Sequence, residues 1–318
     1  MSYNESLIPT FISMIIPVYN DSEGLISTLK SVVAQEYVPE CFEIIVVDNG
    51  STDATYQTAG DFAGQYPNLI KVLEENTVQS SYAARNQGVG IARGEILCFI
   101  DADMSVESDY LKRVARLFSQ SSVDYAGCKV EVFSSDNSML GIYGRATGFP
   151  VERYLFDDHF APTCCLVVSR ALIDKIGLFD SGLESGGDFE FGNRAYRAGF
   201  NLQYSPDIIM KHPARKSIRQ LYNKALRVGR GLRQISCYHT EHFKNNRSIN
   251  RNILNPVYYL PVPPWNFHRA LKGNKAWDNA LVREKIAIYL IYCVIERLGK
   301  QAGYIYEKLK NRQCPKSA

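Results

Sequence analysis

The sequence lacks an apolar run long enough to cross a lipid bilayer. Its longest uncharged apolar stretch, residues 286–295, has ten residues, whereas a transmembrane helix needs about 20. The N-terminus also lacks the basic and apolar segments of a secretion signal. We therefore expect a cytoplasmic protein, with any membrane contact peripheral and at the inner face of the plasma membrane.

Two further sequence signals are missing. The eight cysteines form no C-x-x-C pair, so we expect reduced thiols rather than a zinc site or a disulfide framework. A dinucleotide-binding fingerprint is imitated by Gly88, Gly90 and Gly94. No apolar strand precedes these glycines, and the third lies one residue too far along.

The chain has 318 residues, of which 46% are hydrophobic and 22% charged. This length suits one large domain with an appendage, or two domains. The net charge is only +3, yet residues 211–251 carry eleven Lys or Arg against one acid, Glu241. Such a local excess indicates an anionic partner, which could be a phosphate, a nucleic acid or a membrane surface; a merely solvated basic face is the alternative.

The first hundred residues alternate between strand-like and helix-like segments. Apolar runs at 11–19, 42–47, 68–74 and 95–100 predict strands, and the segments 22–35, 52–66 and 81–94 predict helices. This pattern predicts an α/β fold with a mostly parallel sheet covered on both faces. Ligands of such sheets bind at the carboxyl ends of the strands.

The pattern changes to α+β after about residue 104. We expect a helix at 110–118, strands at 125–133 and 163–169, helices within 170–180 and 187–200, and a strand pair at 201–213. From Ser217 the chain reads as helical and basic. A proline-rich connector at 255–265 then leads to a helical stretch at about 279–310.

Two carboxylates, Asp101 and Asp103, follow the predicted strand 95–100 with only Ala102 between them. Residues i and i+2 of an extended chain point to the same side, so both carboxylates can reach one divalent cation. Mg²⁺ and Mn²⁺ prefer oxygen ligands, and Mg²⁺ is commonly held by one or two carboxylates plus substrate phosphates. The alternative is that the aspartates only end the strand in a turn.

Polar residues also follow the first two predicted strands. Asp48 can accept a hydrogen bond from a base or ribose, and Ser51 or Thr52 can cap the next helix. At the first strand, Pro17 would fix the turn and Tyr19 could stack on a base. The three strand ends would therefore converge on one ligand site.

Five ordered motifs resemble the family 2 glycosyltransferases with the GT-A fold. They are IPVYNDSEGLISTLKSVVAQ, EIIVVDNGSTDAT, YAARNQGVGIARGEILCFIDADM, LIDKIGLFD and GGDFEFGNRAYRAGF. The resemblance implies a GT-A catalytic domain at 1–216, a Rossmann-like αβα sandwich with a nucleotide-binding half at about 1–104 and an acceptor half at about 105–216. Residues 217–318 would form a basic, amphipathic helical C-terminal region.

The resemblance also implies roles for single residues. The nucleotide, usually uridine, would be contacted by Pro17, Val18, Tyr19, Asn20, Asp48, Asn49, Arg85, Asp101 and Ala102. Asp103 would be the chief ligand of a Mn²⁺ or Mg²⁺ ion, with Asp101 as partner and His212 as a third ligand. Arg215 and Lys216 would meet the diphosphate, and Thr163, Cys164, Gly187 and Glu190 the sugar or acceptor.

The candidate general base is Asp188, the first aspartate of the family element that here reads GGDFEFGNR. Inverting transfer is a single displacement, so one carboxylate must take the proton of the acceptor hydroxyl. Gly187 stands where the family usually has Glu. The alternatives are a helix N-cap for Asp188 and a salt bridge to Arg194 for Glu190.

These features predict an inverting, metal-dependent transferase. The resemblance implies that it would move a sugar from a UDP-sugar to a hydroxyl of a glycan or lipid-linked acceptor in polysaccharide biosynthesis. A sugar nucleotidyltransferase and an inactive nucleotide-sugar-binding or membrane-scaffold protein are the alternatives. The C-terminal helices would pack on the main domain or on another subunit, or contact a membrane peripherally. We expect no nucleic-acid partner.

Overall fold

The computed structural model describes residues 9–120, 122–243, 249 and 255–310. The chain divides into two compact units. The first contains Met1–Val130, Pro150–Ser181 and Phe191–His212, and the second contains Glu131–Phe149, Gly182–Glu190 and Pro213–Ala318. The domain boundary at residue 216 stays a prediction, and each unit is described by itself.

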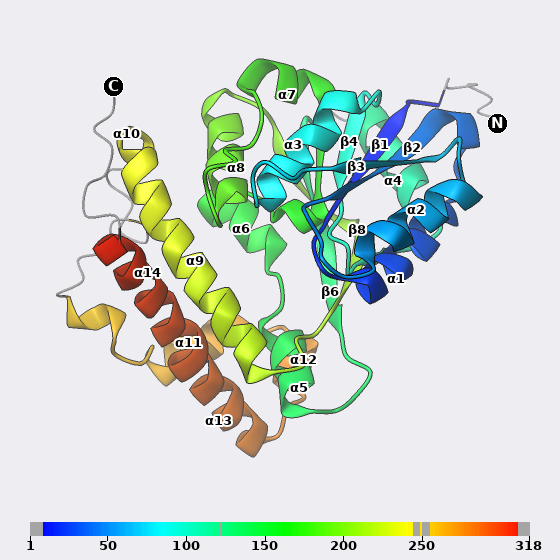
Figure 1. Cartoon of the computed structure of the whole chain (residues 1–318). Coiled ribbons are helices and arrows are strands. Elements are labelled where there is room, and N and C mark those ends of the chain that lie inside the picture. The colour runs from blue at the N-terminus through cyan, green and yellow to red at the C-terminus, as the bar shows by residue number, and fades with distance from the viewer. Residues whose placement is uncertain (1–8, 121, 244–248, 250–254, 311–318) are drawn as a thin grey trace. The chain divides into compact units, whose positions relative to one another are not determined.

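The first unit is built on an eight-stranded sheet in the order β3-β2-β1-β4-β7-β6-β8-β5 (Figure 1). The strands are β1 (Ile12–Val18), β2 (Phe42–Asp48), β3 (Ile70–Glu74), β4 (Ile96–Phe99), β5 (Ser105–Val106), β6 (Tyr125–Phe133), β7 (Leu166–Ser169) and β8 (Leu202–Pro213). Strands β3, β2, β1 and β4 run parallel, whereas β4–β7, β6–β7 and β5–β8 pair antiparallel. The α/β fold class is therefore confirmed, with the parallel part at the N-terminal side.

The helices of this part of the chain follow the predicted pattern, except that α6 was not predicted. They are α1 (Ser22–Val33), α2 (Thr55–Gln65), α3 (Ser81–Ile91), α4 (Tyr110–Gln120), α6 (Val151–Asp158), α7 (Arg170–Ile176) and α8 (Gly187–Arg197). Short 3₁₀ turns lie at Pro39–Cys41 and Thr163–Cys165. Helix α3 packs closely on β1, because a Cβ added to Gly88 would lie 2.6 Å from Ile15 Cγ2. This approach explains a glycine in the middle of a helix.

Three expectations need correction. Residues 201–213 form one long strand, β8, and not a strand pair. Pro17 lies inside β1 opposite Val47, so it does not make the turn. The β1–β4 register ends at Ile15–Phe99, so the N–H that Pro17 lacks would face no strand there. The thiols of Cys41, Cys98, Cys128, Cys164, Cys165 and Cys293 are reduced, but Cys237 is disulfide-bonded.

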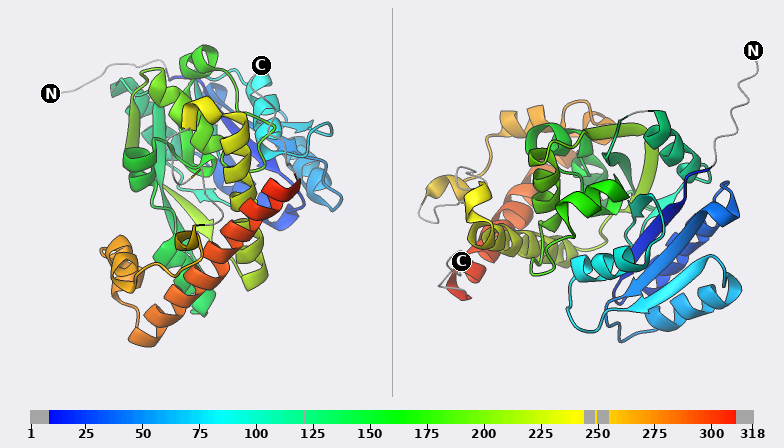
Figure 2. Two further views of the ribbon diagram at one scale, coloured as in Figure 1. Left: turned by 90° about the vertical axis from the view of Figure 1, so that its left-hand side faces the viewer. Right: turned by 90° about the horizontal axis from the view of Figure 1, so that it is seen from above.

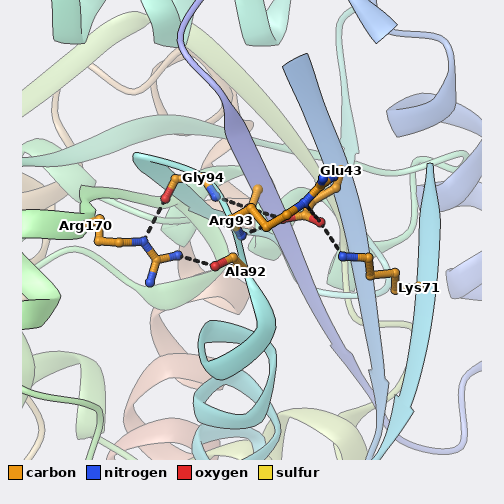
Figure 3. A network of polar contacts seen from close by, with 7 residues as sticks. Glu43, Lys71, Ala92, Arg93, Gly94 and Arg170 are labelled. Atoms are coloured by element: carbon orange, nitrogen blue, oxygen red, sulfur yellow. Dashed lines mark hydrogen bonds and ion pairs between the residues drawn. The ribbon is translucent and has the colours of Figure 1, made fainter. Parts of the chain in front are cut away.

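The amino ends of the strands are held by a polar network around the buried carboxylate of Glu43 (Figure 3). Glu43 accepts hydrogen bonds from Ser13 Oγ at 2.8 Å, Lys71 Nζ at 2.8 Å and the Arg93 backbone N–H at 2.6 Å. The Arg93 guanidinium also donates to it, at 3.2 Å. Arg170 ties α7 to the same loop through the carbonyls of Ala92 and Gly94.

The second unit is helical. It contains α5 (Met139–Thr147), α9 (Ile218–Tyr238), α10 (Thr240–Phe243), η3 (Pro256–Tyr258), α11 (Pro264–Leu271), α12 (Lys275–Asp278), α13 (Val282–Leu290), the π-helical turn η4 (Ile291–Arg297) and α14 (Leu298–Lys310). Helices α9 and α14 run side by side (Figure 1 and Figure 2). Its core is formed by Tyr143, Ala146, Leu221, Phe267, Trp277 and Ile288. Within the described residues, no helix is both long and apolar enough to span a membrane.

Candidate active site

The carboxyl ends of β1, β2 and β4 bring the predicted nucleotide residues together. Val18 lies opposite Asp48 in the β1–β2 register, and Ile15 lies opposite Phe99 in the β1–β4 register. The segments that follow, at residues 19–21, 49–51 and 100–103, therefore leave the same edge of the sheet. Buried apolar strands fix the positions of these polar segments, as expected for the ligand edge of a parallel sheet.

Asp48 is the last residue of β2 and is 2% exposed. Its Oδ2 accepts the backbone N–H of Ser51 at 2.9 Å, whereas its Oδ1 is buried without a hydrogen-bond partner. A buried acceptor without a donor costs free energy, so it is a place where a ligand N–H or O–H is favoured. This arrangement fits the nucleotide role expected for Asp48.

Asn49 and Asn20 organise the loops around Asp48. The Asn49 side chain donates to the carbonyls of Glu75 and Val78, so it fixes the loop after β3. Asn20 has a positive φ of 49°. Its side-chain oxygen accepts the Thr52 N–H at 2.8 Å, joining the ends of β1 and β2. Asn49 therefore has a loop-building role that the sequence did not indicate.

Residues 17–19 differ in their access to a ligand. Pro17 and Val18 are buried within β1, so their side chains belong to the sheet. Tyr19 is 51% exposed and follows the strand directly. Of these three side chains, that of Tyr19 is the one available to stack on a base.

Arg85 and Asp101 form an ion pair in which the Arg85 side chain is buried. Arg85 Nη2 lies 2.5 Å from Asp101 Oδ1, and the two side chains are 4% and 38% exposed. A buried guanidinium needs a partner charge, and Asp101 supplies it. Because this pairing uses one oxygen of Asp101, Asp103 carries the less compensated charge of the two aspartates.

Asp103 lies beside His212, with Asp103 Oδ2 and His212 Nε2 3.7 Å apart. The antiparallel register of β5 and β8, in which Ser105 faces Lys211, brings these residues together. Burial raises the pKa of Asp103; His212 opposes this shift, and the charges of Asp101 and Asp21 add to it. Asp103 is thus a carboxylate in need of more positive charge than the protein supplies.

The residues around Asp103 fit a divalent cation held together with a substrate. Among the described residues, no three His, Cys, Asp or Glu side chains are grouped so that they could hold a metal ion by themselves. Mg²⁺ in nucleotide sites usually has one or two carboxylate ligands, with phosphates and waters completing the shell. Asp103, with Asp101 or His212 beside it, matches that smaller protein contribution.

Asp21 was not predicted as a site residue. It caps α1 by accepting the Gly24 N–H at 3.0 Å, and its charge contributes to the raised pKa of Asp103. The sequence signal for it was present in the motif IPVYNDSE, where it follows Asn20. Its capping geometry alone gave no reason to relate it to residues 80 positions away.

The Thr163–Cys165 turn lies next to the end of β4. It leads into β7, whose Val167 pairs with Cys98 of β4. Burial is the main cause of the raised pKa of the Cys165 thiol, and the nearby Asp101 charge adds to it. Thr163 and Cys164 are both buried. The turn is therefore close to Asp101, as a sugar-contacting role would need.

The predicted base and its neighbours lie in the second unit. Asp188 is the second residue of α8, so it is inside the first turn and is not the N-cap. Its Oδ1 accepts the N–H of Phe189 at 2.9 Å. The positive φ of Gly186, 84°, sets the entry into this helix before Gly187. Carboxylates in a first turn are favoured by the helix dipole.

Glu190 and the basic pair also belong to the second unit. Glu190 is buried, and its Oε1 lies 4.0 Å from His239 Nδ1. Arg194, its expected partner, donates to the carbonyls of Ile176 and Leu178. Arg215 lies near another carboxylate of the second unit, that of Glu296. Burial raises the pKa of Glu296, but nearby cations, of which Arg215 is one, lower it overall. Lys216 is exposed and precedes the N-cap of α9.

The fold is that of solved GT-A glycosyltransferases. A mannosyltransferase from Pyrobaculum calidifontis, solved with GDP-Man and Mn²⁺, has the same fold, with a TM-score of 0.63 at 18% identity over 96% of this chain and 88% of that one. Residues 1–349 of TarS from S. aureus, solved with UDP, give a TM-score of 0.53 at 19% identity, covering 95% and 92%.

The sequence comparisons give the family. The glycosyl transferase family 2 model matches residues 13–177. The glycosyltransferase AglE of Haloferax volcanii is 32% identical over 304 residues, which cover 95% of this chain and 98% of that protein. The chain therefore belongs to glycosyl transferase family 2 and is a glycosyltransferase with a GT-A fold.

Proposed function

We propose that the chain is an inverting, metal-dependent transferase that moves a sugar from a UDP-sugar to a hydroxyl of a glycan or lipid-linked acceptor. The observation that carries this proposal is the pair of carboxylates, Asp48 and Asp103, at the sheet edge. Asp48 Oδ1 has no donor, and the pKa of Asp103 is raised by burial and neighbouring acids. Asp48 is suited to accept a hydrogen bond from a nucleobase, and Asp103 is suited to bind a cation that also binds a diphosphate.

The preference for uridine follows from the bonding of Asp48. Ser51 already occupies Oδ2, which leaves one oxygen to accept a base N–H. Uracil offers one ring N–H donor, whereas guanine offers an N–H and an amino group side by side and suits a carboxylate with both oxygens available. We therefore assign UDP rather than GDP as the donor nucleotide.

In the proposed mechanism Asp103, with Asp101 and His212, would hold a Mn²⁺ or Mg²⁺ ion. The ion, when bound, neutralises charge on the leaving group. Arg85 orients Asp101 through their ion pair. Asp188 takes the proton of the acceptor hydroxyl as the hydroxyl oxygen attacks the anomeric carbon, and UDP leaves from the opposite face. This one-step displacement inverts the anomeric configuration.

The donor and metal assignments can be tested together. The protein is incubated with a panel of UDP-sugars and with GDP-mannose, each with Mn²⁺, Mg²⁺ or EDTA, and the released nucleoside diphosphate is measured. We expect release from at least one UDP-sugar that EDTA abolishes. Release from GDP-mannose alone, or release that EDTA leaves intact, contradicts the proposed donor or the proposed metal.

The base assignment is tested by two amide variants in the same helix. Asp188→Asn should lower kcat about 10²–10⁴-fold, the usual contribution of a positioned base, with little change in KM for the donor. Glu190→Gln should keep most of the activity, because Glu190 is buried beside His239. If Glu190→Gln lost more activity than Asp188→Asn, the general base would be Glu190 instead.

A further inference from the structure

A row of exposed aliphatic side chains runs along the C-terminal helices of the second unit. It consists of Val282, Ile286, Leu290, Val294 and Leu298, which are between 40% and 75% exposed. We call this row the apolar ridge. Its members are four residues apart, and the sixteen steps from the first to the last cover about 24 Å at the helical rise. Exposed apolar surface that is contiguous, rather than scattered singly, marks an interaction site.

The π-helical turn keeps the ridge on one face. In an α-helix four residues turn through slightly more than one revolution, so a row at this spacing drifts by about 40° with each step. A π-helix has a wider turn, with i→i+5 bonding, so the same step drifts the opposite way. The turn η4 covers Ile291–Arg297. The drift from Val282 to Leu290 is therefore reversed between Leu290 and Leu298.

The opposite face of the helix is already occupied. Ile288 is fully buried in the core of the second unit, and Tyr289, Ile291, Tyr292 and Ile295 pack against that core. Tyr289 also donates to the Val262 carbonyl at 2.7 Å. Helix α14 lies too close to α9 to rotate, since a Cβ on Gly303 would come 2.0 Å from the Leu226 carbonyl. The ridge cannot turn inward without breaking these contacts.

The acidic and basic residues of the same helix occupy different positions. Residues 282–310 contain six Lys or Arg and three Glu. Two of the acids, Glu296 and Glu307, are buried, and Glu284 caps the helix by accepting the Leu281 N–H at 2.8 Å. The cations are Arg283, Lys285, Arg297, Lys300, Lys308 and Lys310. Lys300 is paired with Glu296 at 3.6 Å. Arg283 and Lys285 lie next to Val282 and Ile286 in the sequence, so the outer side of the helix is apolar along the ridge and positive beside its first turn.

The loop that contains Val257 and Leu260 is a second apolar part of this surface, and Arg297 holds it in place. Arg297 donates to the carbonyls of Val257 and Leu260, which holds the loop before α11 against the helix. Val257 and Leu260 are 58% and 56% exposed. An apolar strip flanked by cations, on a helix anchored by its other face, is the pattern of a helix that lies in a membrane interface.

We propose that the second unit docks on an anionic lipid surface through the apolar ridge, with the flanking cations against the headgroups. Lipid is favoured over a second copy of the chain by charge. Two copies joined ridge to ridge would bring their like cations together, whereas anionic headgroups neutralise them. This docking extends the proposed function by placing the enzyme where a lipid-linked acceptor is found, but it does not depend on the transfer reaction.

The test is co-sedimentation of the full chain with vesicles of phosphatidylcholine alone and with 30% phosphatidylglycerol. We expect binding to the anionic vesicles that falls at least tenfold in the double variant Leu290→Glu/Val294→Glu. Phe156→Glu is the matched control, because Phe156 is 71% exposed but lies on α6 of the first unit. It should bind as the unchanged protein does.

Two further measurements make the result decisive. Thermal unfolding and nucleotide release from a UDP-sugar should be unchanged in the double variant, so that lost binding is not lost folding. Absence of vesicle binding by the unchanged chain, or equal binding by the double variant, overturns the proposal. A concentration-dependent dimer that the double variant abolishes, seen by ultracentrifugation, would overturn it in favour of self-association.

Discussion

The carboxylates at the two ends of the parallel sheet have pKa values shifted in opposite directions. At the amino ends, Glu43 is 1% exposed and accepts bonds from Ser13, Lys71 and Arg93. Burial alone would raise its pKa, but these donors hold the pKa below the ordinary value. At the carboxyl ends, burial and neighbouring acids raise the pKa of Asp103 although His212 is near.

This contrast separates a carboxylate that supports the fold from one for which we propose a ligand. A buried charge stabilises the fold only when its partners compensate its desolvation. Glu43 has these partners within the protein, whereas Asp103 lacks sufficient positive charge and would obtain it from a cation. Strongly perturbed groups of the second kind collect at functional sites. Substitutions at the two ends should therefore affect different properties.

The largest effect is expected at the carboxyl end. Asp103→Asn should lower kcat/KM about 10³-fold, because metal stabilisation of the leaving group is worth several kcal/mol and each 1.36 kcal/mol is tenfold in rate. The melting temperature without metal should be no lower than that of the unchanged protein, since a disfavoured charge is removed. Nucleotide release and thermal unfolding measure the two effects.

The control for this variant is Asp174→Asn, which changes an exposed aspartate of α7. It should leave both activity and melting temperature unchanged. If Asp103→Asn kept its activity, or unfolded at a clearly lower temperature than Asp174→Asn, the functional reading of Asp103 would be wrong.

The converse substitution lies at the amino end. Glu43→Gln should lower the free energy of unfolding by about 3 kcal/mol, because breaking a buried charged network leaves its partners uncompensated. Activity per folded molecule should be retained, since Glu43 lies at the opposite end of β2 from Asp48. Urea unfolding and active-site titration measure the two. Glu40→Gln, at an exposed glutamate three residues earlier, should have no effect; a similar loss there would remove the special role of Glu43.

The sequence indicated that Asp48 and Asp101 meet at the carboxyl edge of the sheet, but it did not indicate the amino-end network. The aspartates follow an apolar run that can only be a buried strand, and parallel topology then brings Asp48 and Asp101 to one edge. The partners of Glu43 come from β1, β3 and the loop after α3. No local pattern marks contacts between residues 28 or more positions apart, so this network needed the three-dimensional structure.

The same reason explains the residues that were misread. From its neighbours in the sequence alone, Pro17 is expected in a turn. The structure shows why a central strand tolerates it: β4 is short, so no strand needs the N–H that Pro17 lacks. The nucleotide role predicted for Arg85 stays a prediction, but its pairing with Asp101 was not foreseen, because it depends on how α3 packs on the sheet. The helices α5 and α6 were missed because their short segments lack a long amphipathic repeat.

Acid should reduce the contribution of Glu43 in a defined direction. Its folded-state pKa is lower than the ordinary value of 4.5, so its stabilisation is present above that value and is lost as the pH falls through the folded-state pKa. The difference in unfolding free energy between the unchanged protein and Glu43→Gln should therefore shrink below about pH 4.5, by about 1.4 kcal/mol for each unit of pKa difference. Urea unfolding at pH 7, 5, 4 and 3 measures it. A difference that stays constant or grows in acid would contradict the charge-based origin of the network.

The smallest effect on the free energy of unfolding is expected when the cations that surround Glu43 are replaced. Lys71 and Arg93 have side chains that are 43% and 59% exposed. Exposed partners of an ion pair contribute about 1 kcal/mol or less because water and salt screen them. In Lys71→Met and Arg93→Met the buried Ser13 hydroxyl and the backbone N–H at residue 93 still bind the carboxylate. Each variant should therefore lose less than a third of what Glu43→Gln loses in urea unfolding at low salt, and less again at 0.5 M NaCl. A loss as large as that of Glu43→Gln would mean that the surface cations, rather than the buried donors, compensate the charge at this end of the sheet.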